Sequence, residues 1–205
     1  MKVVKVHKKN ALSSAVEIIK RGGIVFSPTD TIYGLLANAL DREAVERLYS
    51  IRRPSGRPFI VLLPDKEWLE AFDLYVDRKY WDLLDAHVTI IFYKKNTIPL
   101  YLTRGKKSLA FRIPKGGTFV RDLLTLLDLP LVAPSANPEG LKPAVDVKMA
   151  EEYFGDRIDL YIDGGYVEGK PSTIVRFIGK RSFRLVREGN VKFEDFLNFA
   201  KNITA

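Results

Sequence analysis

Four short segments of the chain concentrate hydroxyl, carboxylate, amide and guanidinium groups, the side chains that bind polar and anionic ligands. These segments are Ser27–Leu35, Ile51–Pro58, Leu131–Pro138 and Asp163–Thr173. Three of them follow or contain apolar runs that predict strands. Loops at the carboxyl ends of strands are where α/β sheets bind ligands. We therefore expect these loops to form a binding crevice.

The first segment allows two interpretations. Residues 27–33 contain three hydroxyls, one carboxylate and one phenol. Small hydroxyls at a strand end can bind a polar ligand, and Tyr33 could offer its ring or its hydroxyl. The same residue types also form Asp and Thr turns that satisfy their own backbone. The residue pattern by itself favours the turn.

The second segment is an arginine loop. Arg52, Arg53 and Arg57 lie around Pro54 and before Pro58, and the prolines hold the backbone extended. The guanidinium fork matches phosphate oxygens, so the loop could bind a phosphate chain. The alternative is a solvated basic loop, which is what most charge runs are.

The third and fourth segments could also bind an anion. Ser135 and Asn137 stand two positions apart, so an extended loop lets both face one way, toward a triphosphate or a base edge. A local turn is the alternative. The three glycines of Asp163–Thr173 permit tight turns and backbone amides directed at an anion. Neither a Walker loop nor a GxGxxG dinucleotide motif is present.

Two isolated arginines end predicted strands. Arg112 stands before Ile113-Pro114, and Arg187 stands before Glu188-Gly189. A charge in such a position can face a cleft, although a surface ion pair is the more common arrangement.

Several reaction classes are excluded. The chain has no cysteine, which excludes disulfides, thiol nucleophiles and cysteine-ligated metals. His7 and His87 have no partner at metal-ligand spacing, and no metal ligands are identified among the side chains. GxSxG and HExxH motifs are absent. The chemistry is therefore expected to proceed by positioning and charge stabilisation, without a covalent intermediate.

Helical and strand patterns alternate along the chain, which predicts an α/β fold. Helices are predicted over Ala11–Arg21, Asp41–Ile51, Lys66–Phe72, Tyr80–Leu84, Thr118–Leu127, Val147–Phe154 and Phe193–Lys201, the first two capped by Asn10 and Asp41. Strands are predicted over Ile24–Ser27, Phe59–Leu63, Val88–Phe92, Leu109–Ile113, Leu131–Ala133, Leu160–Ile162, Ser172–Phe177 and Phe183–Arg187. Because a short turn through Gly179 joins the last two strands, the sheet is expected to be mixed.

Composition sets the broad class. The 205 residues, 46% of them hydrophobic, suit one globular domain over 1–205. The net charge of +8 favours polyanionic partners such as nucleotides, pyrophosphate or RNA, or else reflects an ordinary basic surface. The apolar runs are too short to cross a membrane, and no secretory signal is expected. We therefore expect a cytoplasmic protein.

Six stretches, taken in order, resemble the YrdC-type threonylcarbamoyl-AMP synthase family. They are Pro28–Leu35, Arg52–Pro58, Phe111–Pro114, Ala133–Asn137, Gly164–Gly165 with Ser172–Val175, and Arg187–Gly189. The resemblance implies a twisted mixed sheet with flanking helices and a deep, basic central cavity. It also implies a reaction in which L-threonine, bicarbonate and ATP, with Mg²⁺, give threonylcarbamoyl-AMP and pyrophosphate. A transferase complex downstream would then modify position 37 of tRNA, and tRNA or double-stranded RNA is a further candidate partner.

The resemblance also assigns residues to roles. L-threonine would contact Thr31, Arg112, Ala133 and Ser172. The nucleotide would contact Arg52, Arg53, Thr89, Ser135, Asn137 and Arg187, of which Arg53, Ser135 and Asn137 would be catalytic. The chain departs from the family pattern where Arg52 replaces a lysine and Leu62 a histidine. These departures lean toward the YciO branch, so the alternative is a nucleotide- or RNA-binding paralogue without full synthase activity.

Overall fold

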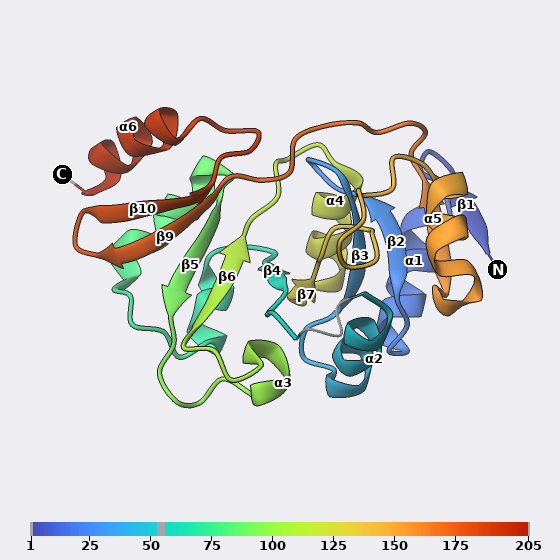
Figure 1. The fold of residues 1–205 in the computed structure, drawn as a ribbon, viewed down its shortest axis with the longest axis horizontal. Coiled ribbons are helices and arrows are strands. Elements are labelled where there is room, and N and C mark those ends of the chain that lie inside the picture. The colour runs from blue at the N-terminus through green and yellow to red at the C-terminus, as the bar shows by residue number, and fades with distance from the viewer. Residues whose placement is uncertain (1, 53–55, 205) are drawn as a thin grey trace.

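The computed structural model describes residues 2–52 and 56–204. Its strands form one mixed ten-stranded sheet in the order β1-β8-β2-β3-β7-β4-β6-β5-β9-β10 (Figure 1). The strands are β1 (Val3–Lys5), β2 (Val25–Pro28), β3 (Tyr33–Asn38), β4 (Ile60–Leu62), β5 (Thr89–Tyr93), β6 (Ser108–Arg112), β7 (Leu131–Val132), β8 (Leu160–Asp163), β9 (Ile174–Gly179) and β10 (Ser182–Arg187). The mixed α/β fold predicted from the sequence is confirmed.

Helices cover both faces of the sheet. The α-helices are α1 (Ala11–Lys20), α2 (Arg42–Arg52), α3 (Leu100–Thr103), α4 (Phe119–Leu127), α5 (Val147–Phe154) and α6 (Phe193–Thr204). The 3-10 helices are η1 (Glu67–Ala71), η2 (Arg78–Ala86) and η3 (Gly155–Arg157). The N-terminus and C-terminus lie at opposite ends of the molecule (Figure 1). No helix in the described part of the chain is long and apolar enough to cross a membrane.

Alternation along the strands divides the core in two. On β2, Val25 packs in the cluster that α1 and α4 cover, whereas its neighbour Phe26 packs in the larger cluster on the other face. On β3, Leu36 joins the first cluster and Leu35 joins the second. Successive side chains of a strand point to opposite faces, so these strands are buried on both sides.

The helix ends confirm one predicted cap and correct another. Asp41 caps α2, because its Oδ1 accepts hydrogen bonds from the amides of Glu43 and Ala44 at 3.0 and 3.1 Å. Asn10 precedes α1 as predicted, but its side chain makes no capping hydrogen bond. The left-handed turn after α1 is made by Gly22, with φ +78°.

Some elements were not predicted. β3 begins inside Ser27–Leu35, which we interpreted as a turn from its hydroxyl and carboxylate residues. β1, α3 and η3 are short and were also missed. The segments predicted as helices around residues 66–72 and 80–84 form the 3-10 helices η1 and η2.

Candidate active site

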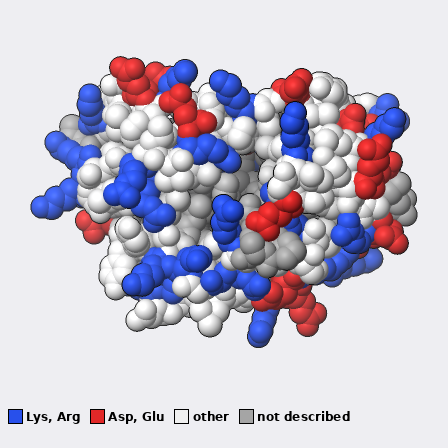
Figure 2. All heavy atoms as spheres, in the orientation of Figure 1, with Lys and Arg blue, Asp and Glu red and all other residues white. Residues whose placement is uncertain are grey.

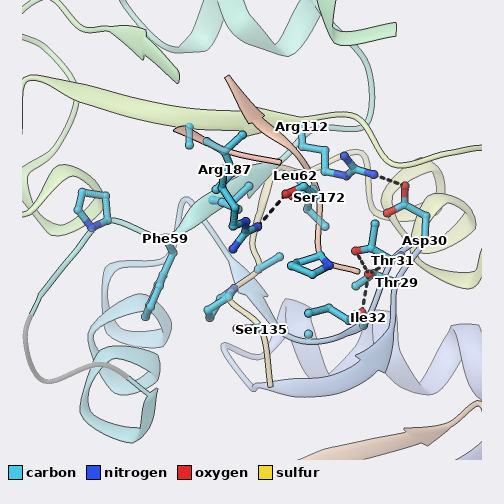
Figure 3. A pocket seen from close by; sticks show the side chains of 18 of the residues that line it. Thr29, Asp30, Thr31, Ile32, Phe59, Leu62, Arg112, Ser135, Ser172 and Arg187 are labelled. Carbon is cyan, nitrogen blue, oxygen red and sulfur yellow. Dashed lines mark hydrogen bonds and ion pairs between the residues drawn. The ribbon is translucent and has the colours of Figure 1, made fainter. Parts of the chain in front are cut away.

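A cavity of about 320 Å³ brings the distant loops together. Its lining comes from the β2–β3 turn, the residues before and within β4, strands β5, β6 and β9, the segment after β7, and the end of β10. Figure 3 shows Thr31, Arg112, Ser135, Ser172 and Arg187 around this space. The predicted convergence of these segments is therefore found in the fold.

The β2–β3 turn is held by its own side chains. Thr29 Oγ1 donates to the carbonyl of Ile32 at 2.6 Å and lies 3.2 Å from Thr31 Oγ1. The self-satisfying turn that the residue pattern favours is therefore present. The turn also lines the cavity, so the two interpretations of this segment are compatible.

Arg112, the last residue of β6, lies in the cavity wall and is fixed on two sides. Its Nη2 donates to Asp30 Oδ2 at 2.5 Å, and its Nη1 donates to the carbonyl of His87. The arginine and aspartate side chains are 3% and 4% exposed. Asp30 Oδ2 also accepts from the amide of Lys115 at 3.0 Å. The ion pair thus joins the β2–β3 turn to the end of β6. It is buried, unlike the surface ion pair that is more common for such an arginine.

A second group of contacts positions Ser172. Its Oγ lies 2.8 Å from Thr89 Oγ1, and its carbonyl accepts from Arg187 Nη2 at 2.8 Å. Thr89 is fully buried behind the cavity wall, while Arg187 points into the cavity (Figure 3). Partial desolvation lowers the pKa of the Arg187 guanidinium. Ser172 and Arg187 therefore form one wall, backed by Thr89.

A third group surrounds Ser135. Arg52 Nε donates to the Ser135 carbonyl at 2.8 Å, and Arg52 Nη2 donates to Ser135 Oγ at 3.1 Å and to Asn137 Oδ1 at 3.2 Å. Ser135 Oγ donates to Asn137 Oδ1 at 2.7 Å. Asn137 Nδ2 in turn donates to the carbonyls of Pro138 and Leu141. Arg52 thus bonds to both polar residues of this loop, Ser135 and Asn137.

Three of the predicted site residues are absent from the described lining of the cavity. Arg52, Thr89 and Asn137, which were expected to contact the nucleotide, are buried. Their polar groups bond to Ser135 and Ser172, which do line the cavity. Lining the cavity are the predicted residues Thr31, Arg112, Ala133, Ser135, Ser172 and Arg187. Arg53 lies outside the described residues.

Two glycine amides after β8 that were expected to face an anion bond to protein groups instead. The Gly164 amide donates to the Tyr33 hydroxyl at 2.9 Å, and the Gly165 amide donates to Asp163 Oδ1 at 2.8 Å. The Tyr33 hydroxyl itself donates to the Gly165 carbonyl at 2.8 Å, and burial raises its pKa. Its ring stacks on Phe26. Tyr33 and these glycines therefore fix the back of the β2–β3 turn.

Sequence reasoning missed Asp30 as a site residue and did not assign Arg57 to the ligands. Both line the cavity. Asp30 was visible in the sequence only as one polar residue among hydroxyls, because its partner Arg112 is 82 positions away. Leu62, noted as a departure from the family pattern, lies in the cavity wall. It stands on β4 opposite Arg112 of the neighbouring strand β6.

The lining can neutralise an anionic ligand. Its charged side chains are Arg57, Arg112, Arg187 and Asp30, and the carboxylate is already paired with Arg112. Guanidinium groups with hydroxyls between them suit a carboxylate and phosphates in one space. The described residues contain no cluster of three metal-ligating side chains.

The comparison with family models decides the classification. The model of the Sua5/YciO/YrdC family, described as telomere recombination, matches residues 17–189. The chain belongs to this family. The Sua5/YciO/YrdC match includes every described residue that lines the cavity.

Relatives within the Sua5/YciO/YrdC family differ in length. A threonylcarbamoyl-AMP synthase of Pyrococcus abyssi is 32% identical over 171 residues, 78% of this chain and 49% of that protein. The crystal structure of P. abyssi Sua5 complexed with L-threonine has a TM-score of 0.84 at 28% identity, over 96% of this chain and 59% of the other. The Escherichia coli YciO structure has a TM-score of 0.79 at 26% identity, over 95% of this chain and 97% of YciO. The chain thus spans about half of the curated synthase and nearly all of YciO.

Proposed function

We propose that the cavity binds L-threonine beside ATP and forms threonylcarbamoyl-AMP. The threonine amine attacks the carbon of bicarbonate, water leaves, and a carbamate forms. A carbamate oxygen then attacks the α-phosphorus of ATP. The bond from that phosphorus to the bridging oxygen breaks, and pyrophosphate leaves. No step needs a nucleophile from the protein, in agreement with the absence of a nucleophile motif in the sequence.

One observation carries the proposal. A buried guanidinium, Arg112, lies in the same cavity as the hydroxyl residues Thr31 and Ser172. A fork of this kind pairs with the carboxylate of an amino acid, and hydroxyl groups can bind its hydroxyl and amine. Support comes from P. abyssi Sua5, whose structure of similar fold was solved as a complex with L-threonine. We assign threonine to the Thr31–Arg112–Ser172 side, with Ala133 completing that pocket.

The phosphates would lie beside the threonine in the same cavity. Arg57, Ser135 and Arg187 also line it, and Arg187 is anchored through the Ser172 carbonyl. Fixed positive side chains stabilise the negative charge that develops on phosphate oxygens in the transition state, and this lowers the barrier to the transfer. Arg52 and Asn137 would act by holding Ser135, and Thr89 by holding Ser172. The role proposed for Arg53 rests on the family pattern.

Mg²⁺ would enter as part of the substrate MgATP. Asp30 is the one carboxylate among the described lining residues, and it is committed to Arg112 and to the Lys115 amide. This donor set does not suit a protein-held metal site, since Mg²⁺ prefers several oxygen ligands. Phosphate oxygens and water would hold the ion.

The product would be consumed by a transferase that moves the threonylcarbamoyl group to position 37 of tRNA. Such a mixed anhydride is reactive, so the acceptor complex must take it up soon after release. We propose the cytoplasm as the compartment, because ATP and tRNA are both substrates of this sequence of reactions.

The experiment measures pyrophosphate release with each substrate omitted in turn. We expect release only when threonine, bicarbonate and MgATP are all present. Arg112→Ala should raise the KM for threonine far more than the KM for ATP. The exposed Lys9→Ala is the matched control, because Lys9 lies outside the lining. Release that does not depend on threonine would reject the proposal.

A second candidate function is nucleotide binding without synthase activity, as a YciO-like paralogue. The observation that favours it is Leu62, an apolar side chain in the cavity wall where the family pattern has a histidine. In this case ATP binds to the cavity with an affinity that threonine does not change, and pyrophosphate is not released. The substrate-omission experiment separates the two functions.

A further inference from the structure

A second hollow lies at the far end of β5 and β6. It encloses about 500 Å³, and four of its nine lining residues are lysines. The full set is Tyr75, Tyr93, Lys94, Lys95, Asn96, Leu100, Gly105, Lys106 and Lys107. We call it the Tyr–Lys groove. None of its lining residues is shared with the cavity of the candidate active site.

The groove keeps large aromatic and aliphatic side chains at the surface. Tyr75 is 65% exposed, Tyr93 41% and Leu100 72%. The backbone holds the two tyrosines side by side, because the Tyr75 amide donates to the Tyr93 carbonyl at 2.8 Å. Exposed aromatic side chains that lie together are typical of interaction sites.

The lysines are only partly neutralised. Lys95 pairs with Asp73 at 3.1 Å, whereas Lys94, Lys106 and Lys107 form no salt bridge within residues 2–52 and 56–204. Lys94 and Lys107 stand opposite each other, joined by a backbone hydrogen bond of 3.0 Å. Like charges facing each other across paired strands destabilise a fold. A partner that brings negative charge to the groove would relieve this repulsion.

Cations also lie over the aromatic rings. Lys95 Nζ is 5.9 Å from the centre of the Tyr75 ring, and the Arg176 guanidinium is 5.5 Å from that of Tyr93. Figure 2 shows Lys and Arg side chains gathered over this end of the molecule, around α3 and the ends of β5 and β6. The groove therefore combines ring faces and positive charge in one place.

Tyr93 of the groove points to the same face of the sheet as the active-site cavity. Tyr93 follows Ile91 by two positions on β5, and such residues point to one face. Ile91 lines the cavity, and Tyr93 lines the groove. On β6, Ala110 lines the cavity, and Ser108, two positions before it, pairs with Tyr93 and accepts a hydrogen bond from Arg176. A chain lying along this face can extend from the groove toward the cavity.

We propose that the Tyr–Lys groove binds a single-stranded segment of nucleic acid. The bases would stack on Tyr75 and Tyr93, and the phosphates would pair with Lys94, Lys106 and Lys107. This combination of ring faces with a positive groove is how proteins bind single strands without reading their sequence. An acidic peptide would use the lysines but would gain little from the two ring faces. The proposal does not depend on the synthase activity.

The experiment measures the binding of a labelled single-stranded RNA of about 12 nucleotides by fluorescence anisotropy. We expect Tyr75→Ala to weaken binding about fivefold or more, and Tyr75→Phe, which keeps the ring, to bind like the unmodified protein. Replacing Lys106 and Lys107 by Gln should make the slope of log K against log salt shallower by about 1.4. Single-stranded DNA of the same sequence reports whether the ribose hydroxyl contributes.

The matched control is the double variant Lys8→Gln/Lys9→Gln, which removes the same charge from exposed positions in the N-terminal segment. It should retain RNA binding, and the groove variants should retain threonine-dependent pyrophosphate release. Saturating MgATP with threonine should leave the RNA bound. The proposal is overturned if MgATP displaces the RNA, if Tyr75→Ala binds unchanged, or if duplex RNA, polyglutamate or phosphatidylserine vesicles bind as tightly as the single strand.

Discussion

Asp30 and Arg112 form a buried ion pair at the junction of the β2–β3 turn and the end of β6, with Nη2 2.5 Å from Oδ2. The pair has two consequences. It fixes the guanidinium that we assign to threonine, and it ties two segments that are 82 positions apart. A substrate carboxylate must therefore bind to an arginine whose charge is already partly balanced.

The ion pair should be needed for stability. Asp30→Ala is expected to lower the free energy of unfolding by about 3–5 kcal/mol, because it leaves a buried guanidinium charge without its partner. Asp30→Asn should cost less, since its amide oxygen still accepts a hydrogen bond. Urea unfolding measures both. The double variant Asp30→Leu/Arg112→Met removes both charges and should be more stable than Asp30→Ala. An equal loss of unfolding free energy in Asp30→Ala and in the double variant would contradict this account.

Arg52 should act on ATP without touching it. Arg52→Gln removes the fork that holds Ser135 and Asn137, so Ser135 loses its fixed position in the cavity wall. A loss of about 1.4 kcal/mol in nucleotide binding corresponds to a tenfold higher KM for ATP. The KM for threonine should change little, and Arg52→Lys should not restore the KM for ATP, because an ammonium group lacks the fork. Equal changes in both KM values would indicate a general loss of structure.

Gly189 should tolerate no side chain. A Cβ at this position would lie 1.9 Å from the Pro171 carbonyl oxygen. The Gly189 amide also donates a hydrogen bond to Thr173 Oγ1 at 2.9 Å, which holds the backbone in place. Gly189→Ala is therefore expected to cost about 1–3 kcal/mol or more, measured by thermal unfolding. The control is Gly116→Ala at an exposed site with open space around it, which should change stability by less than about 0.5 kcal/mol. Similar melting temperatures for both variants would contradict the close packing.

Stability should fall at alkaline pH. Burial raises the pKa of Tyr161 to about 12, and its hydroxyl donates to the Gly155 carbonyl at 2.6 Å. In the unfolded chain a tyrosine titrates near pH 10, so between about pH 10 and 12 the folded state holds more protons than the unfolded state. The stabilisation is complete below pH 10 and is lost as the pH rises through 12.

Urea unfolding at about pH 9 and about pH 11, with tyrosinate absorbance as a second signal, tests this pH dependence. In Tyr161→Phe the loss between the two pH values should be smaller, because the titrating group is gone. Burial also raises the pKa of Tyr33 and Tyr101, so some loss should remain. An identical loss in both proteins would exclude Tyr161 as a contributor.

The sequence by itself determined the local elements and the residue types of the site. Short apolar runs identified most strands, the periodicity of residues 11–21 identified α1, and Asp41 identified the start of α2. These features depend on neighbours within a few positions, so a linear reading can find them. The ordered polar segments likewise indicated which loops would meet, and the fold brings them to one cavity.

Only the tertiary structure decided where each polar residue lies and what it contacts. Arg52, Asn137 and Thr89 have the residue types of ligand contacts, yet they lie behind the wall and support Ser135 and Ser172. β3 became a strand because its partners β2 and β7 supply its hydrogen bonds, not because of its own pattern. The pairing of Asp30 with Arg112 and the Tyr–Lys groove arise from segments distant in the chain. Burial and pairing depend on such distant segments, which local sequence does not specify.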